Sequence, residues 1–117
     1  MNYEDEDEAL PYTTIGTDEA KQMIEGGTRI IDVRQPEEWD RGHIAEAELV
    51  PLNGIYGFGK ALKELQLPPD EEVIFVCAAG QRSAVASEIA LVTGLNKVYN
   101  LANGMNGWMN RRYPIER

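Results

Sequence analysis

Short apolar runs alternate along the chain with amphipathic stretches, and this alternation predicts a succession of strands and helices. Most of the runs are four or five residues long and rich in β-branched residues, which is typical of strands. The run VIFV at 73–76 is unbroken, as expected of a strand buried on both faces of a sheet. The predicted strands cover residues 12–15, 29–33, 48–52, 73–76 and 97–101.

Helical periodicity connects the first of these runs. A helix is expected with Thr17 as its N-cap, because apolar side chains follow at helical spacing: Ala20, Met23 and Ile24. Pro36 favours a short helix over 36–40, since proline fits the first helical turn. The segment 53–59 contains three glycines and is expected to be a loop. After it, apolar residues again share one helical face: Phe58, Leu62 and Leu65.

The second half of the chain predicts a strand, a helix and another strand in succession. The helix is expected to run from about Ser83 to Gly94, with one apolar face formed by Val85, Ile89 and Val92. Such a unit places its two strands parallel and close together. A last short helix is expected at 104–111. The whole pattern predicts one α/β domain over residues 11–117, with a central, mostly parallel sheet flanked by helices.

Composition and charge narrow the classes of function. A chain of 117 residues with 43% apolar and 26% charged residues fits a single soluble domain. The net charge is −9, and five of these charges lie in Glu4–Glu8, so that removing them leaves −4. We expect residues 1–10 to form an acidic, disordered tail. An acidic surface repels phosphate groups, so neither nucleic-acid nor membrane binding is expected.

The absence of long apolar segments and the cysteine count bear on location. No run approaches the roughly 20 apolar residues that a membrane-spanning helix needs, and the N-terminus does not resemble a secretory signal. The chain has a single cysteine, Cys77, so an internal disulfide cannot form. A lone thiol fits a reducing compartment, and a cytoplasmic location is expected.

Cys77 directly follows the apolar run 73–76 and precedes a predicted helix. Functional groups gather at the carboxyl ends of parallel strands, which is where this thiol would lie. Backbone N–H groups of the loop and the dipole of the helix would favour the thiolate and lower the pKa of Cys77. Gly80 lets the loop curl tightly, and Arg82 adds a positive charge. The alternative is a buried, inert cysteine at a strand end.

Three sequence blocks resemble those of rhodanese domains. The segment CAAGQRS at 77–83 is similar to the family's active-site loop. IDVR at 31–34, followed by EW at 38–39 and GHI at 42–44, resembles an early block, and LANGMNGW at 101–108 a late one. The blocks come in the family's order, and the resemblance covers roughly residues 12–112. It implies a rhodanese-like three-layer fold with helices on both faces of the sheet.

The resemblance also implies a chemistry. Cys77 would take a sulfane sulfur from a donor such as thiosulfate or a persulfide, and pass it as a Cys77 persulfide to a thiol or cyanide acceptor. The loop would bind the sulfur and the anionic donor through Ala78, Ala79, Gly80, Gln81 and Arg82. Asp32, Arg34 and Ser83 would support the site. The expected partners are a small anionic sulfur donor and a thiol acceptor, with a protein persulfide as another donor, and no metal or organic cofactor is needed.

The chain departs from the rhodanese sequence pattern at two places. Thiosulfate-active members often have a basic residue just after the cysteine, where this chain has Ala78 and Ala79, so its donor could instead be a protein persulfide or a polysulfide. Asn103 replaces a more usual glycine, and asparagine tolerates left-handed backbone angles.

A non-catalytic module for partner binding or redox signalling is the alternative function, although the intact Cys77 and Arg82 favour an enzyme. A phosphatase is disfavoured because such enzymes have a longer C-x5-R loop. His43, the only histidine, is expected to stabilise a local turn.

Overall fold

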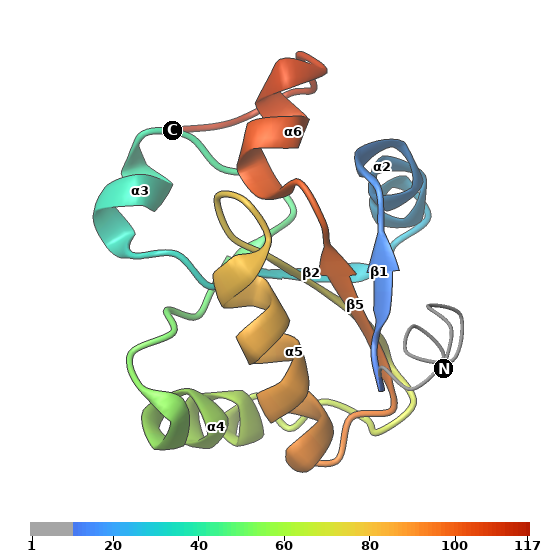
Figure 1. The fold of residues 1–117 in the computed structure, drawn as a ribbon, viewed down its shortest axis with the longest axis vertical. Coiled ribbons are helices and arrows are strands. Elements are labelled where there is room, and N and C mark those ends of the chain that lie inside the picture. Colours follow the sequence, from blue (N-terminus) through green and yellow to red (C-terminus); the bar gives the residue numbers. More distant parts are fainter. Residues whose placement is uncertain (1–10) are drawn as a thin grey trace, which may run out of the picture.

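The computed structural model describes residues 11–117, and the acidic tail predicted for residues 1–10 lies outside them. Strands and helices alternate along most of the described chain (Figure 1). Their order is β1 (Thr13–Ile15), α2 (Thr17–Glu25), β2 (Arg29–Asp32), α3 (Pro36–Asp40), β3 (Glu48–Leu49), α4 (Ile55–Glu64), β4 (Glu72–Val76), α5 (Gln81–Val92), β5 (Lys97–Leu101) and α6 (Gly104–Asn110). The predicted α/β class is confirmed. Among the helices of residues 11–117, none has the length and apolar character needed to cross a membrane.

The five strands form one sheet in the order β1-β5-β4-β2-β3, and every neighbouring pair is parallel. The predicted strand–helix–strand unit is confirmed, because β4 and β5 are parallel neighbours joined by α5. Asp32 pairs with Val76 at the carboxyl ends of β2 and β4. The residues that follow these two central strands therefore meet at one edge of the sheet.

Alternating side chains of the strands pack into two cores on opposite faces of the sheet. In β4, Val73 and Phe75 belong to a core that includes residues of α4 and α5. Ile74 and Val76 point to the other face, where they join a core that includes residues of α2 and α6. All four side chains are fully buried, as predicted for this run. The result is the expected three-layer arrangement, with helices covering both faces (Figure 1).

The N-terminal boundaries of α2 and α4 differ from those predicted. In α2 the N-cap is Gly16, whose backbone is extended, while Thr17 is already the first helical residue and is buried. In α4 the helix begins at Ile55, so most of the segment predicted to be a glycine-rich loop is helical. Gly59 lies in this helix where an added Cβ would be 3.5 Å from the side chain of Ile89 in α5. A small residue there permits close packing of the two helices, which overrides the low helix propensity of glycine.

The buried face of α5 is also different from the predicted one. The helix begins at Gln81 rather than near Ser83, and Gly94 follows its end. Val85 and Val92 are exposed, and Ile89 is only partly buried. Small residues face the sheet instead: Ser83, Ala86, Ser87 and Ala90. They let the helix approach the strands closely, so residue size rather than hydrophobicity marks its inner face.

The segment after β2 continues to pair with the chain around β3. The strand itself is shorter than the predicted 48–52, but the N–H groups of Val50 and Leu52 still donate to the carbonyls of Asp32 and Val33. At the other end of the chain, Glu116 exchanges two backbone hydrogen bonds with His43. These contacts hold the chain on both sides of α3, the helix that faces the carboxyl end of β4.

Candidate active site

Cys77 lies at the carboxyl end of β4, and the loop 77–80 leads directly into α5. Gly80 is the N-cap of that helix, with a left-handed φ of 100°. A Cβ at this position would lie 2.3 Å from the carbonyl oxygen of Ala102. Glycine is therefore required both by the turn and by the close approach of the segment that follows β5. The loop therefore curls tightly over the end of the sheet, as the sequence predicted.

The start of α6 holds the outer side of this loop. The N–H groups of Met105 and Asn106 donate to the carbonyl oxygens of Cys77 and Ala78, at 2.8 and 3.0 Å. The approach requires Gly104, since a Cβ there would lie 2.3 Å from the Cys77 oxygen. Gly104 also has the left-handed φ of 52°, whereas Asn103 has a φ of −99°. The left-handed tolerance expected of Asn103 is thus not used.

Hydrogen-bond donors surround the sulfur of Cys77, which is 1% exposed. The N–H groups of Gly80 and Ser83 lie 3.1 and 3.3 Å from Sγ, and the Ser83 hydroxyl lies 3.3 Å from it. Burial alone would raise the pKa of the thiol. The Ser83 hydroxyl and the backbone N–H groups of Ser83, Ala79 and Gly80 outweigh burial, so the pKa of Cys77 lies below its ordinary value.

Ser83 connects the sulfur to Asn100, a buried residue of β5. The Ser83 hydroxyl donates to Asn100 Oδ1 at 2.5 Å, and the Asn100 amide donates to the Gly80 carbonyl at 3.3 Å. A hydroxyl has one proton, so in this arrangement the neutral thiol donates to Ser83 Oγ. When Cys77 ionises, the Ser83 proton can turn to the sulfur. Sequence reasoning missed Asn100, although a polar side chain within the otherwise apolar end of a predicted strand was a usable signal.

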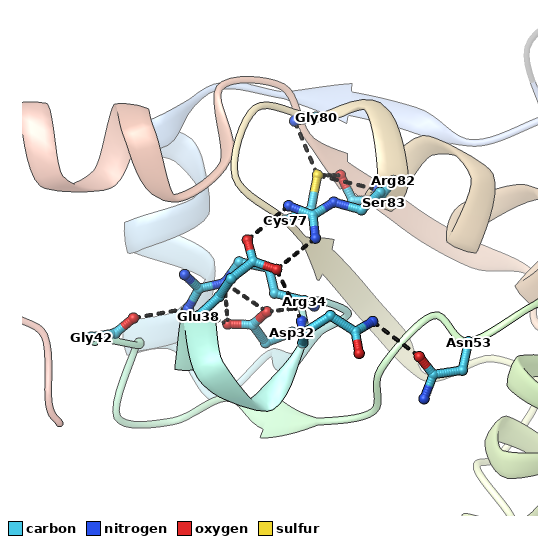
Figure 2. A network of polar contacts seen from close by, with 10 residues as sticks. Asp32, Arg34, Glu38, Gly42, Asn53, Cys77, Gly80, Arg82 and Ser83 are labelled. Carbon is cyan, nitrogen blue, oxygen red and sulfur yellow. Dashed lines mark hydrogen bonds and ion pairs between the residues drawn. The ribbon is translucent and has the colours of Figure 1, made fainter. Parts of the chain in front are cut away.

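Arg82 lies at the rim of the loop and is paired with Glu38 of α3. Its Nη1 and Nη2 atoms donate to the two carboxylate oxygens of Glu38 at 2.7 and 3.0 Å. Figure 2 shows the guanidinium between the Cys77 loop and Glu38. Hydrogen bonding to Arg82, helped by a bond from the Gln35 N–H, lowers the pKa of Glu38 to about 2. The sequence predicted the cation but not its partner, which lies 44 residues away.

Asp32 and Arg34 form a second, buried ion pair at the end of β2. Arg34 donates to both carboxylate oxygens of Asp32 and to the carbonyl of Gly42, at 2.8–3.1 Å. Their side chains are 0% and 6% exposed. Figure 2 shows this pair on the side of Glu38 away from Cys77. Its bonds are to the protein itself, which fits the supporting position expected for both residues.

The remaining predicted site residues lie around the mouth of the loop. Ala79 and Gln81 are exposed, and Ala78 is partly buried. His43 stacks on Trp39 with 3.6 Å between ring centroids, and its Nδ1 lies 2.9 Å from the Trp39 carbonyl oxygen. Together with its backbone bonds to Glu116, these contacts agree with the predicted turn-stabilising role.

A buried thiol held by backbone N–H groups at the carboxyl end of a parallel α/β sheet is an arrangement that can stabilise negative charge on the sulfur. The model of the family described as "Rhodanese-like domain" matches residues 16–111. The chain belongs to this family, and the resemblance found in the sequence is confirmed.

Several relatives of the chain are named as sulfurtransferases. It is 31% identical over 113 residues to the "Probable adenylyltransferase/sulfurtransferase MoeZ" of Mycobacterium tuberculosis, covering 95% of this chain but only 28% of that protein. It is 29% identical over 116 residues to "Thiosulfate sulfurtransferase 18" of Arabidopsis thaliana, covering 92% of this chain and 85% of the relative.

Solved structures agree with this assignment. The crystal structure of a rhodanese-related protein from Thermoplasma volcanium has a TM-score of 0.74 and 30% sequence identity, covering 90% of this chain and 98% of that one. The family and its relatives support sulfur transfer as the general activity.

Proposed function

We propose that this domain is a sulfurtransferase that moves a sulfane sulfur from a donor to a thiol or cyanide acceptor through a persulfide on Cys77. The observation that supports it most strongly is the set of donors around Sγ, two backbone N–H groups and one hydroxyl within 3.3 Å. These groups stabilise negative charge on sulfur, which is the form that attacks a donor. They would equally stabilise the charge of a persulfide in the same loop.

The reaction consists of two displacements at sulfur. The Cys77 thiolate attacks the outer sulfur of the donor, a new S–S bond forms, and the bond to the donor's leaving group breaks. The leaving group departs with the bonding electron pair, as sulfite from thiosulfate or as a thiolate from a persulfide. An acceptor thiolate or cyanide then attacks the outer sulfur of the persulfide, and Cys77 leaves as a thiolate. Electrons balance without an external oxidant or a resident cofactor.

The charge and the exposure of the loop around Cys77 indicate which kind of sulfur donor the site would accept. Ala78 and Ala79 bring no charge to the position where a doubly charged anion would bind, which supports a protein persulfide over thiosulfate as the working donor. The donor would present its outer sulfur on a group slender enough to reach Cys77, a residue that is only 1% exposed. A free thiolate needs a reducing compartment, so we place this activity in the cytoplasm.

Intact-protein mass spectrometry tests the proposal. The wild type and the Cys77→Ser variant are incubated separately with thiosulfate and with polysulfide, and then with cyanide. We expect the wild type alone to gain a sulfur atom and to lose it to cyanide as thiocyanate. If neither of these donors loads Cys77, and the monoanion methanethiosulfonate does not load it either, the enzyme proposal is wrong and the non-catalytic binding module becomes the better account.

A further inference from the structure

The charged groups beside the Cys77 loop balance one another. Both terminal nitrogens of Arg82 donate to Glu38, and Arg34 forms an ion pair with Asp32. Glu38 also interacts with the positive charge of Arg34, and Arg82 interacts with the negative charges of the Cys77 thiolate and of Asp32. Two acidic and two basic side chains thus cancel, and the cluster becomes net negative when Cys77 ionises.

The outer mouth of the loop adds no positive charge. The residues between Cys77 and Arg82 are Ala78, Ala79, Gly80 and Gln81, which are all uncharged. Beside Ala79 lies a hollow of about 550 Å³ whose other lining residues are also neutral: Asn103, Asn106, Gly107 and Asn110. The side of the loop at Ala79 therefore presents amide groups rather than cations.

From this arrangement we infer that Glu38 determines donor specificity by holding Arg82, so that the site selects sulfane-sulfur donors of low charge and disfavours dianions. The inference rests on the proposed sulfur transfer and names the class of its donor. Organic persulfides and thiosulfonates, which have at most one negative charge at the reacting end, belong to the favoured class. Thiosulfate, with two, belongs to the disfavoured one.

The physical reason lies in the geometry of the guanidinium. Arginine recognises an anion with two parallel N–H bonds, and in Arg82 one N–H of each terminal nitrogen already points at Glu38. A dianion must either break this ion pair or bind beside the Glu38 carboxylate, and both alternatives cost more than they do for a monoanion. Glu38 remains ionised throughout the neutral range, so its ion pair with Arg82 is present there.

Two donors that differ in one charge provide the test. Thiosulfate and methanethiosulfonate both present a sulfane sulfur bonded to an oxidised sulfur, and the second has a methyl group in place of one charged oxygen. Their leaving groups are sulfite and methanesulfinate. The kcat/KM of thiocyanate formation with cyanide is measured for each donor, and the ratio of the two values cancels any general loss of activity.

The critical variant is Glu38→Gln, which removes the charge and keeps an oxygen that can accept the Gln35 N–H. Its matched control is Glu37→Gln, which makes the same change in net charge on an exposed neighbour in α3. We expect Glu38→Gln to raise the thiosulfate-to-methanethiosulfonate ratio by about three- to thirtyfold, the range for one charge removed near the donor at intermediate effective dielectric. The control should change it by less than about twofold, because exposed charges are screened.

An unchanged ratio in Glu38→Gln, or an equal loss with both donors, would show that Glu38 is only structural and would overturn the inference. Should that variant not fold, the wild type provides a second measurement. Sulfate should then protect Cys77 against alkylation no better than methanesulfonate does, and clearly stronger protection by the dianion contradicts the inference. If no donor loads wild-type Cys77, the proposed sulfur transfer is wrong, and the specificity inference is wrong with it. If donors load but the ratio does not respond, only the specificity inference fails.

Discussion

Ser83 contacts the Cys77 sulfur through its backbone N–H and its hydroxyl, and the hydroxyl also donates to Asn100. The residue therefore belongs to the thiol's electrostatic environment and to the buried polar contacts of β5 at the same time. Replacing Ser83 should separate its effect on the thiol from its effect on the buried polar contacts. The first is measured by the reactivity of Cys77, and the second by the free energy of unfolding.

In Ser83→Ala we expect the pKa of Cys77 to rise, since the hydroxyl is the largest of the contributions that lower it. Alkylation of Cys77, followed against pH, should require a higher pH than in the wild type. The free energy of unfolding should also fall by about 1–3 kcal/mol, because Asn100 Oδ1 loses its donor in a buried environment.

The control for this change is Ser87→Ala, one turn further along α5. Ser87 is equally buried, and its hydroxyl donates to the Ser83 carbonyl rather than to the sulfur. Its replacement should leave the pH profile of alkylation in place. A profile that moves equally in both variants would mean that helix packing, and not the Ser83 hydroxyl, controls the thiol.

The sequence predicts those site residues that lie close together along the chain, and it does not predict those that only the fold brings to the loop. Cys77, Gly80 and Arg82 lie within six positions of one another, so local spacing indicated that they form one loop. Glu38 and Asn100 reach that loop only through the fold, from 44 positions before Arg82 and 17 after Ser83. Their contribution depends on which strand ends are neighbours, and the local pattern contains no information on that order.

At the scale of elements, the same limit explains the errors in α4 and α5. Periodicity identifies a helical face but not which face is turned inward when small residues lie on the other side. In α5 the inner face consists of alanine and serine, because the helix lies close to the strands. In α4 one glycine, Gly59, faces α5 at close range, whereas composition alone indicated a loop. The central strands β2 and β4 were predicted more accurately, since their burial on both faces leaves a continuous apolar run.

Contact between α6 and the active-site loop leads to a prediction for Gly104→Ala. The left-handed backbone should cost about 1–3 kcal/mol in a residue with a Cβ, and the clash with the Cys77 carbonyl adds to this. We expect a lower midpoint of thermal unfolding and a changed rate of Cys77 alkylation in the folded protein. A variant with wild-type stability and reactivity would show that α6 does not hold the loop.

Gly57→Ala is the matched control in α4. Gly57 is exposed, lies within the helix and has open space where the Cβ would be added. Because alanine is the better helix former, this substitution should stabilise the protein by about 0.5–1 kcal/mol. It should not change the reactivity of Cys77, and the opposite signs of the two glycine substitutions test the packing directly.

At the scale of the whole molecule, the ion pair of Glu38 and Arg82 links α3 to α5 across the mouth of the site. The pKa of Glu38 is about 2 in the folded protein, below its ordinary value of 4.5. A carboxyl whose pKa is lowered by folding adds stability above its unfolded pKa. That stability is lost as the pH falls through the folded pKa.

Wild-type stability should therefore decrease more steeply than that of Glu38→Gln between about pH 5 and pH 3. The expected difference is about 1 kcal/mol, because both partners are partly exposed and solvent screens them. Denaturant unfolding at the two pH values measures it. Identical pH dependence in the two proteins would show that the pair does not form in solution.

The depth of Cys77 bears on the regiochemistry of a persulfide formed there. An acceptor that attacked the inner sulfur would form a mixed disulfide with the protein and release hydrosulfide, so that the transferable atom would be lost. The inner sulfur is the Cys77 Sγ, enclosed by the loop and 1% exposed, whereas the outer atom would project toward the mouth. Access decides which sulfur of such a bond is attacked. Burial of the cysteine would thus direct each encounter toward delivery of the sulfur atom instead of toward a dead-end adduct.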